Sequence, residues 1–316
     1  MRAREIFFSL IVILLVTPVL THSQTPTAVM LSCSGDVMIV RDGQTIKGAF
    51  GLNLRPGDEI RTGQDSQAEI HFDGGNWVRI GSNSSMQVKG QPQAKPEEPP
   101  AGVSMGTKSF QTVQNFIKLK NSEGSSSLVR LRSGEKHPEL RAESPRHTMV
   151  RGRPTFRWSV SDPSTELKLT VYDEDGVYWQ HEVLDTMALT YPADAPPLAP
   201  GTAYSWTLET TDPLKFPPLR SQAAFFEILS TEDDEELQNA LGEIAREGES
   251  SVSAVHLVRA SLFFEYNLLD EAIAETQRAI AVDPENPALR SILARLYAQT
   301  GRSAEALDEY DKILEK

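Results

Sequence analysis

Residues that could act in catalysis or bind a metal are scattered along this chain of 316 residues. They show none of the spacings that are typical of an active site or a metal site. The six histidines include no His-x-x-x-His pair for a metal, and no serine stands in a Gly-x-Ser-x-Gly turn. Two acidic runs, residues 173–176 and 233–236, could bind a cation. The first lacks the downstream ligands of a calcium loop and is interpreted as a turn, and the second suits the positive end of a helix. The sequence therefore predicts no catalytic residues, no cofactor and no metal site, and a protein that is not an enzyme.

Tryptophans offer a different chemistry, since an indole can stack on a sugar ring. Trp77 alternates with Val78 and Ile80, a pattern that favours packing over sugar binding. An alternative interpretation is that Trp77, Trp179 and Trp206 form a sugar-binding face, and that the chain is a carbohydrate-binding or enzyme-accessory protein. That alternative requires the three indoles to be exposed and coplanar.

The end of the chain, residues 253–316, holds two copies of one helical hairpin. Ala260 returns as Ala294 and Ala272 as Ala306, an offset of 34 residues in each case (294 − 260 and 306 − 272). Small residues at these positions let two helices approach closely. The segment resembles the tetratricopeptide repeat family, which has this period and two antiparallel helices per unit. The resemblance implies a surface that binds proteins.

Other positions of the repeat agree with the family or depart from it. Asn267 and Gly301 fall between the two helices of each copy, where the chain needs a residue in the left-handed conformation. The family prefers a large aromatic residue where this chain has His256 and Arg290, and Leu where it has Arg259.

In the frame of the repeat, the first helix of each copy lines an inner groove. Phe264 and Arg295 are large enough to anchor a peptide, although Phe264 could equally pack on a neighbouring helix. The candidate partner-binding residues are Leu257, Ser261, Phe264, Ser291 and Arg295. Because about three repeats are usually needed for a stable stack, the open end could be covered by a partner, by a second copy in a homo-oligomer or by the β domains.

Residues 1–23 are predicted to be a signal peptide. Arg2 and Arg4 precede an apolar core at residues 6–20, which is short for a membrane span, and small residues lead to a cut after Ser23. The alternative is an uncleaved N-terminal anchor. Both interpretations place the protein outside the cytoplasm, in the periplasm or cell envelope, or secreted.

The net charge and the cysteine content bear on which partners the protein could bind and on whether disulfides could stabilise it. The net charge of −13 disfavours a nucleic acid as partner. The single cysteine, Cys33, cannot form a disulfide within the chain, so the exported domains must rely on their cores. We expect Cys33 to be a buried strand residue rather than a lipidation site, because a polar stretch separates it from the apolar core.

The first part of the mature chain is predicted to be a small all-β domain, with turn residues every eight to twelve positions. From about residue 29 to 88 its motifs resemble the FecR-like domain: Gly35-Asp36-Val37, Leu54, Gly57-Asp58-Glu59-Ile60, Thr62-Gly63, Asp73-Gly74 and Asn83-Ser84. In the best-known members this domain is the outer half of a membrane sensor. Since only Met1 to Glu5 precede the apolar run, we expect a free-standing envelope version, and a periplasmic sensing component is the less favoured alternative.

The FecR-like domain is assigned to residues 24–139, with a Pro-rich insert at residues 90–106. Strand patterns are predicted again at residues 109–119 and 127–131. These strands either complete the β domain or form a separate hairpin.

Residues 140–230 are predicted to be a β-sandwich with Trp158 in its core. The run from Leu198 to Trp206 resembles the start of the sixth strand in fibronectin type III and immunoglobulin-like sandwiches. There a tyrosine hydroxyl, here that of Tyr204, bonds to the backbone upstream. Residues 231–252 are predicted to be a capping helix and a loop, with Thr231 as the N-cap.

The predicted fold class is multidomain, with an N-terminal all-β domain, a middle sandwich and a C-terminal helical array. The predicted function is a non-enzymatic envelope scaffold. Its helical array would bind an envelope protein, and its β domains would contact a wall or surface polysaccharide.

Overall fold

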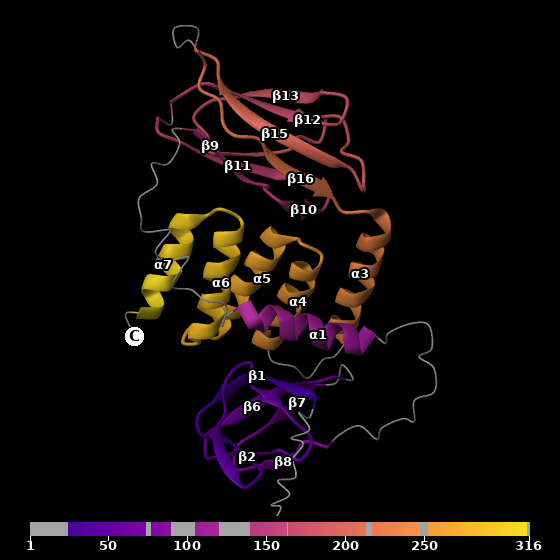
Figure 1. Ribbon diagram of the computed structural model, residues 1–316, viewed down its shortest axis with the longest axis vertical. Coiled ribbons are helices and arrows are strands. Elements are labelled where there is room, and N and C mark those ends of the chain that lie inside the picture. The colour runs from indigo at the N-terminus through magenta and orange to yellow at the C-terminus, as the bar shows by residue number, and fades with distance from the viewer. Residues whose placement is uncertain are drawn as a thin grey trace, which may run out of the picture.

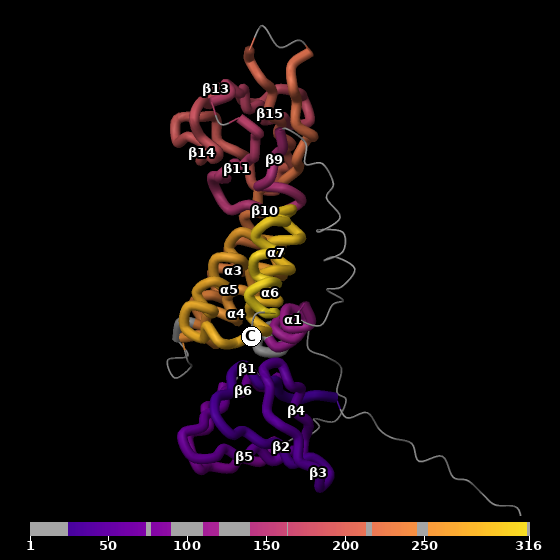
Figure 2. Tube along the Cα trace, turned by 90° about the vertical axis from the view of Figure 1, so that its left-hand side faces the viewer, coloured from indigo at the N-terminus to yellow at the C-terminus, as the bar shows by residue number. Residues whose placement is uncertain are grey.

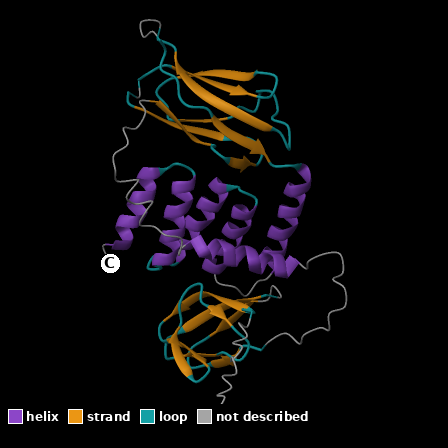
Figure 3. Cartoon of the chain, in the orientation of Figure 1, coloured by secondary structure: helices purple, strands orange, loops and turns teal. Residues whose placement is uncertain are grey.

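The computed structural model describes residues 25–73, 77–89, 105–119, 140–162, 164–212, 217–246 and 252–314. A layer of helices lies between two β units, one at each end of the long axis (Figures 1 and 3). This arrangement confirms the predicted combination of β domains and a C-terminal helical array. The predicted signal peptide, residues 90–104 of the Pro-rich insert and the strand predicted at residues 127–131 lie outside the described residues.

The N-terminal β module consists of two four-stranded sheets, with strand orders β4-β1-β6-β7 and β3-β2-β5-β8. Apolar side chains from alternate positions, among them Met30, Ile39 and Ile70, form a core between the sheets. The strands are β1 (Ala28–Ser34), β2 (Val37–Arg41), β3 (Gln44–Lys47), β4 (Asn53–Leu54), β5 (Glu59–Thr62), β6 (Gln67–Phe72), β7 (Trp77–Ile80) and β8 (Ser85–Gln87).

A tight turn and a buried ion pair stabilise this module. Asp42 and Gly43 both have positive φ, 49° and 76°, as the two-residue turn between β2 and β3 requires. Arg41 donates two hydrogen bonds, of 2.9 and 2.7 Å, to the buried carboxylate of Asp58. Burial alone would raise the pKa of Asp58, but the bonds from Arg41 and from the Arg55 amide hold that pKa below its ordinary value.

The second β unit is a sandwich of a five-stranded sheet, β10-β16-β15-β12-β13, and a three-stranded sheet, β14-β11-β9. Both sheets contribute to a single apolar core. The strands are β9 (Leu140–Ser144), β10 (Thr148–Val150), β11 (Thr155–Val160), β12 (Leu167–Tyr172), β13 (Val177–Val183), β14 (Ala188–Thr190), β15 (Ala203–Thr210) and β16 (Ala224–Ile228).

The predicted core aromatics of the sandwich lie inside it. Trp158 and Tyr204 are both buried, and the Tyr204 hydroxyl accepts a hydrogen bond of 3.0 Å from the Ala199 amide, five residues upstream. Trp206 is fully buried as well, and its indole N–H donates to the Pro145 carbonyl at 2.8 Å. The predicted bond from the tyrosine to the upstream backbone is therefore confirmed.

The helical layer contains α3 and two helical hairpins that stack side by side. Ser230, rather than the predicted Thr231, caps α3, because its hydroxyl accepts a hydrogen bond from the Asp233 amide at 3.1 Å. The helices are α3 (Thr231–Arg246), α4 (Val252–Glu265), α5 (Leu269–Val282), α6 (Pro287–Gln299) and α7 (Ser303–Leu314).

The strand predicted at residues 109–119 is wrong, since this segment belongs to α1 (Met105–Lys118). Its buried apolar residues are Phe110, Val113, Phe116 and Ile117, spaced three, three and one apart, which places them on one face of a helix. The β module therefore closes without this segment, and α1 lies between that module and the helical layer (Figures 1 and 2).

The sandwich is joined to the first hairpin at the turn between α4 and α5. Asn267 has a φ of 54° there, and its carbonyl accepts hydrogen bonds from the Met149 amide at 3.0 Å and from the Thr148 hydroxyl at 2.6 Å. The Ser144 hydroxyl donates to Asp270 at 2.8 Å, at the start of α5. These contacts fix the sandwich on one end of the helical layer.

Candidate functional site

The five candidate partner-binding residues lie on the first helices of the two hairpins. Leu257, Ser261 and Phe264 belong to α4, at intervals of four and three residues, and therefore share a face. Ser291 and Arg295 belong to α6 and are one turn apart. The structure thus divides the set between the two repeats.

Two of these side chains are buried in the described arrangement. Leu257 belongs to the core of the helical layer. Ser261 is fully buried, and its hydroxyl donates to the Val258 carbonyl at 2.8 Å. Neither side chain can reach a partner unless the elements around α4 move.

Phe264 is half-buried, and the face of α4 on which it lies is covered by another helix of the chain. Its ring centroid lies 5.5 Å from that of Phe116, which belongs to α1. The α1 helix packs against α4 and runs across the helical layer close to the β module (Figures 1 and 2). An amphipathic helix of the chain itself is therefore seated on the first repeat.

The α1 helix also contacts the N-terminal β module. The Gln114 amide donates to the Asn53 side-chain oxygen at 3.1 Å, and the Phe110 ring lies 5.8 Å from that of His71. His71 also contacts Trp77, at 5.2 Å between ring centroids, and its Nδ1 atom is buried with no hydrogen-bond partner in the part of the chain that the structure describes. Burial lowers the pKa of His71 to about 4, so the imidazole is neutral at physiological pH.

The α6 side of the candidate site is polar. The Ser291 hydroxyl donates to the Pro287 carbonyl at 3.0 Å, one turn earlier in the same helix. Arg295 is half-buried, and within the described residues its Nη2 atom is buried without a hydrogen-bond partner. A buried donor of this kind would gain from an acceptor supplied by a bound chain.

The three departures from the repeat signature form ion pairs that sequence reasoning missed. His256 Nδ1 lies 2.6 Å from the Glu275 carboxylate, and Arg259 Nε lies 3.5 Å from it. In the second hairpin, Arg290 Nη1 donates to Glu309 at 3.0 Å. The pair recurs at the repeat period, since both 290 − 256 and 309 − 275 equal 34. In each hairpin, a buried glutamate on the second helix thus contacts a nitrogen of a basic side chain on the first helix.

The tryptophan alternative required an exposed, coplanar set, and the structure contradicts it. Trp206 is fully buried in the sandwich, whereas Trp77 belongs to the N-terminal module beside His71. Trp179 stacks on His181, with 5.4 Å between ring centroids. The three indoles therefore make no common sugar-binding face.

The acidic run at residues 173–176 forms an ordinary turn, in which the Asp173 carboxylate accepts hydrogen bonds from the Asp175 and Gly176 amides at 2.9 and 3.0 Å. In the described parts of the chain, no group of three His, Cys, Asp or Glu side chains is placed to hold a metal ion. Nor does any described helix combine the length and the apolar character needed to cross a bilayer.

Comparison with known protein families gives a match over the end of the chain. Residues 263–316, from the end of α4 onward, match the tetratricopeptide repeat. No FecR-like family matches the β-rich part, and no curated protein matches the chain. Among solved structures, the chain is similar to a multi-domain immunophilin from Arabidopsis thaliana, at 10% sequence identity over 57% of this chain and 98% of that chain. The TM-score of 0.21 is too low for the likeness to carry an argument.

Proposed function

We propose that this protein is an exported, non-enzymatic scaffold of the cell envelope, whose helical array binds a protein partner in competition with its own α1. The observation that carries the proposal is α1 itself, seated on α4 with Phe116 against Phe264. A surface that accepts one amphipathic helix through apolar contacts has the chemistry to accept another.

The partner that fits this surface is an amphipathic helix with aromatic residues spaced as in α1. The apolar face of α1 enters the same core as α4, and this packing defines the complementary shape. The unpaired Nη2 atom of Arg295 favours a partner that also carries a carboxylate or a free carbonyl. Tetratricopeptide repeats generally mediate contacts between proteins, which agrees with this assignment.

The other parts of the proposal rest on the sequence. Arg2, Arg4 and the apolar residues 6–20 support export, by a signal peptide or by an anchor. The turn motifs from Gly35 to Ser84 support a FecR-like identity for the N-terminal module. We assign to this module, and to the fibronectin-like sandwich, contact with a wall or surface component of the envelope.

The experiment uses the full chain with α1 released. Val113→Asp places a charge on the buried face of α1 and should detach it, whereas Gln111→Asp makes the same change on the exposed face and serves as the matched control. A labelled peptide with the sequence of residues 105–119 is then titrated while its fluorescence anisotropy is measured. We expect the Val113→Asp protein to bind this peptide more tightly than the wild type or the control does.

In the Val113→Asp background, Phe264→Ala together with Arg295→Ala should weaken peptide binding by about 30-fold through the loss of the Phe264 contact, since a hot-spot residue contributes about 2 kcal/mol. A crosslinking pull-down from envelope fractions with the same variants then tests the natural partner. If the double variant is folded by circular dichroism and still binds the peptide and every partner as before, the array is a spacer or a dimerisation element instead.

A further inference from the structure

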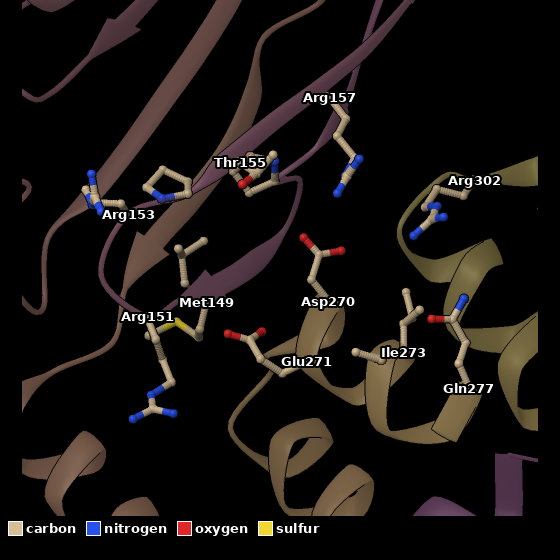
Figure 4. A pocket seen from close by; sticks show the side chains of 14 residues that line it. Met149, Arg151, Arg153, Thr155, Arg157, Asp270, Glu271, Ile273, Gln277 and Arg302 are labelled. Atoms are coloured by element: carbon tan, nitrogen blue, oxygen red, sulfur yellow. The ribbon is translucent and has the colours of Figure 1, made fainter. Parts of the chain in front are cut away.

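A cavity of about 390 Å³ lies between the sandwich and the first helical hairpin (Figure 4). The sandwich lies at the end of the helical layer opposite to α1 (Figure 1). Its walls come from the segment around β10 and β11 and from α5, with Arg302 from the turn between α6 and α7. A cavity of this size is in the range that holds small ligands.

Arginines dominate the polar lining. Arg157 is exposed and faces the cavity from β11, and its side chain makes no ion pair or hydrogen bond among the described residues. Arg302 is held in place, because its Nε donates to Glu305 at 2.8 Å and its guanidinium lies 4.4 Å from the centre of the Tyr297 ring. Figure 4 shows the Arg157 and Arg302 side chains directed toward the same space. A free cation facing a fixed one is suited to bind an anion.

The opposite wall offers acceptors. Asp270 accepts the Ser144 hydroxyl through Oδ2, which leaves Oδ1 for another donor. Gln277 donates one amide N–H to the Tyr297 hydroxyl at 2.7 Å, which leaves its carbonyl oxygen as an acceptor and its second N–H as a donor for a ligand. Burial raises the pKa of the neighbouring Glu271, which also lines the cavity. A ligand that fits would bring hydroxyl donors as well as an anionic group.

We propose that this cavity binds a sugar acid, with the ligand carboxylate between Arg157 and Arg302 and its hydroxyls donating to Asp270 and Gln277. A planar carboxylate matches the two-pronged geometry of a guanidinium. A simple inorganic anion would satisfy the arginines and leave the acceptors unused. A neutral sugar would donate to the acceptors but would bring no negative charge to the arginines.

The test is isothermal titration calorimetry of the full chain at low salt, with D-glucuronate as the probe. We expect Arg157→Gln and Arg302→Gln each to weaken binding by about tenfold or more, because each removes charge-assisted hydrogen bonds. Arg220→Gln is the matched control and should change nothing, since Arg220 is exposed on the same sandwich and pairs with Glu209 outside the cavity.

Three comparison ligands decide the chemical class. Glucose and sulfate should each bind at least about tenfold more weakly than glucuronate, because each lacks one half of the interactions. A tetragalacturonate distinguishes the sources, since tighter binding than that of the monomer would point to the end of a polysaccharide. Weaker binding would point to a free sugar acid.

The proposal fails if glucuronate does not bind, if sulfate or glucose binds equally well, or if Arg157→Gln leaves the affinity unchanged. The Phe264→Ala and Arg295→Ala variant should bind glucuronate like the wild type, because those residues do not line the cavity. The result at this cavity is therefore independent of whether the helical array binds a protein.

Discussion

Acidification should destabilise the contact between the N-terminal β module and α1, because His71 would have to take up a proton where water is excluded. The side chain is 1% exposed and packed between the rings of Trp77 and Phe110. Burial lowers its pKa from 6.5 to about 4. In the unfolded chain the same imidazole would titrate near its ordinary value.

The size and the sign of the effect follow from this difference. Since one pKa unit corresponds to about 1.4 kcal/mol, the full effect on the free energy of unfolding is about 3 kcal/mol. Above pH 6.5 neither state binds the proton, and the stability is at its full value. As the pH falls from 6.5 toward 4, the unfolded state binds the proton first, so the stability falls, and below that range it changes no further through this group.

Urea unfolding at pH 7.5 and pH 4.5 measures this effect, with His71→Phe as the variant that keeps an aromatic ring but cannot titrate. The ¹⁹F signal of fluorotryptophan at Trp77 follows the unfolding of this module separately from the sandwich. The wild type should lose about 3 kcal/mol more than His71→Phe between the two pH values. His181→Phe, a change at an exposed histidine, should behave like the wild type. Equal losses in the wild type and His71→Phe would refute the reasoning.

Four further substitutions test the packing of the cores and the ion pairs of the helical layer. Trp158→Ala should destabilise the sandwich by about 3–5 kcal/mol in thermal unfolding, and a wild-type transition would contradict the buried position of this ring. Ala306→Leu should overpack the contact between α6 and α7 and cost about 1–3 kcal/mol, whereas an unchanged urea midpoint would show that the contact has room. Glu275→Ala should cost about 1–3 kcal/mol, because it leaves the half-buried His256 ring without its hydrogen-bond partner and removes the carboxylate that two partly exposed arginines share. Asp308→Ala, at an exposed pair, should cost less than about 1 kcal/mol, and equal losses in the two variants would argue against a buried network.

Features that depend on local chemistry were predictable from the sequence. Asn267 and Gly301 have φ values of 54° and 78°, as their place between two helices required. Ala272 and Ala306 are fully buried, as expected for positions where two helices approach. In each case the repeat period or a turn requirement specifies the residue, whatever lies elsewhere in the chain.

The α1 helix was not predicted, because the residues that decide its structure are far away. Its aromatic and β-branched residues, among them Phe110, Thr112 and Val113, also fit a strand, and it lacks an acidic first turn. The helical face becomes distinct only against Phe264, 148 positions from Phe116 (264 − 116). A short amphipathic helix of this kind owes its stability to tertiary packing rather than to its own propensity.

The polar residues at repeat positions where the family prefers aromatic ones could be identified from the sequence, but the carboxylates that they contact could not. His256 and Arg290 could be noted as departures from the family preference, yet nothing adjacent to them in the chain indicates a partner. Their partners, Glu275 and Glu309, lie 19 residues later in each case (275 − 256 and 309 − 290). Comparing the two copies for changes that occur together would have found both pairs.

The first hairpin is the element through which the two β units can influence each other. The sandwich bonds to its turn at Asn267, while α1 and β1 contact α4 at the side near the N-terminal module. The buried residues of β1, α1 and the helical layer form one continuous cluster, which includes Val29 and Leu31 of the β module. A partner that displaced α1 from α4 would therefore open this shared core and loosen the N-terminal module from the layer. Under the proposed function, we therefore expect partner binding at the helical array to change the orientation of that module and to leave the sandwich contact at Asn267 in place.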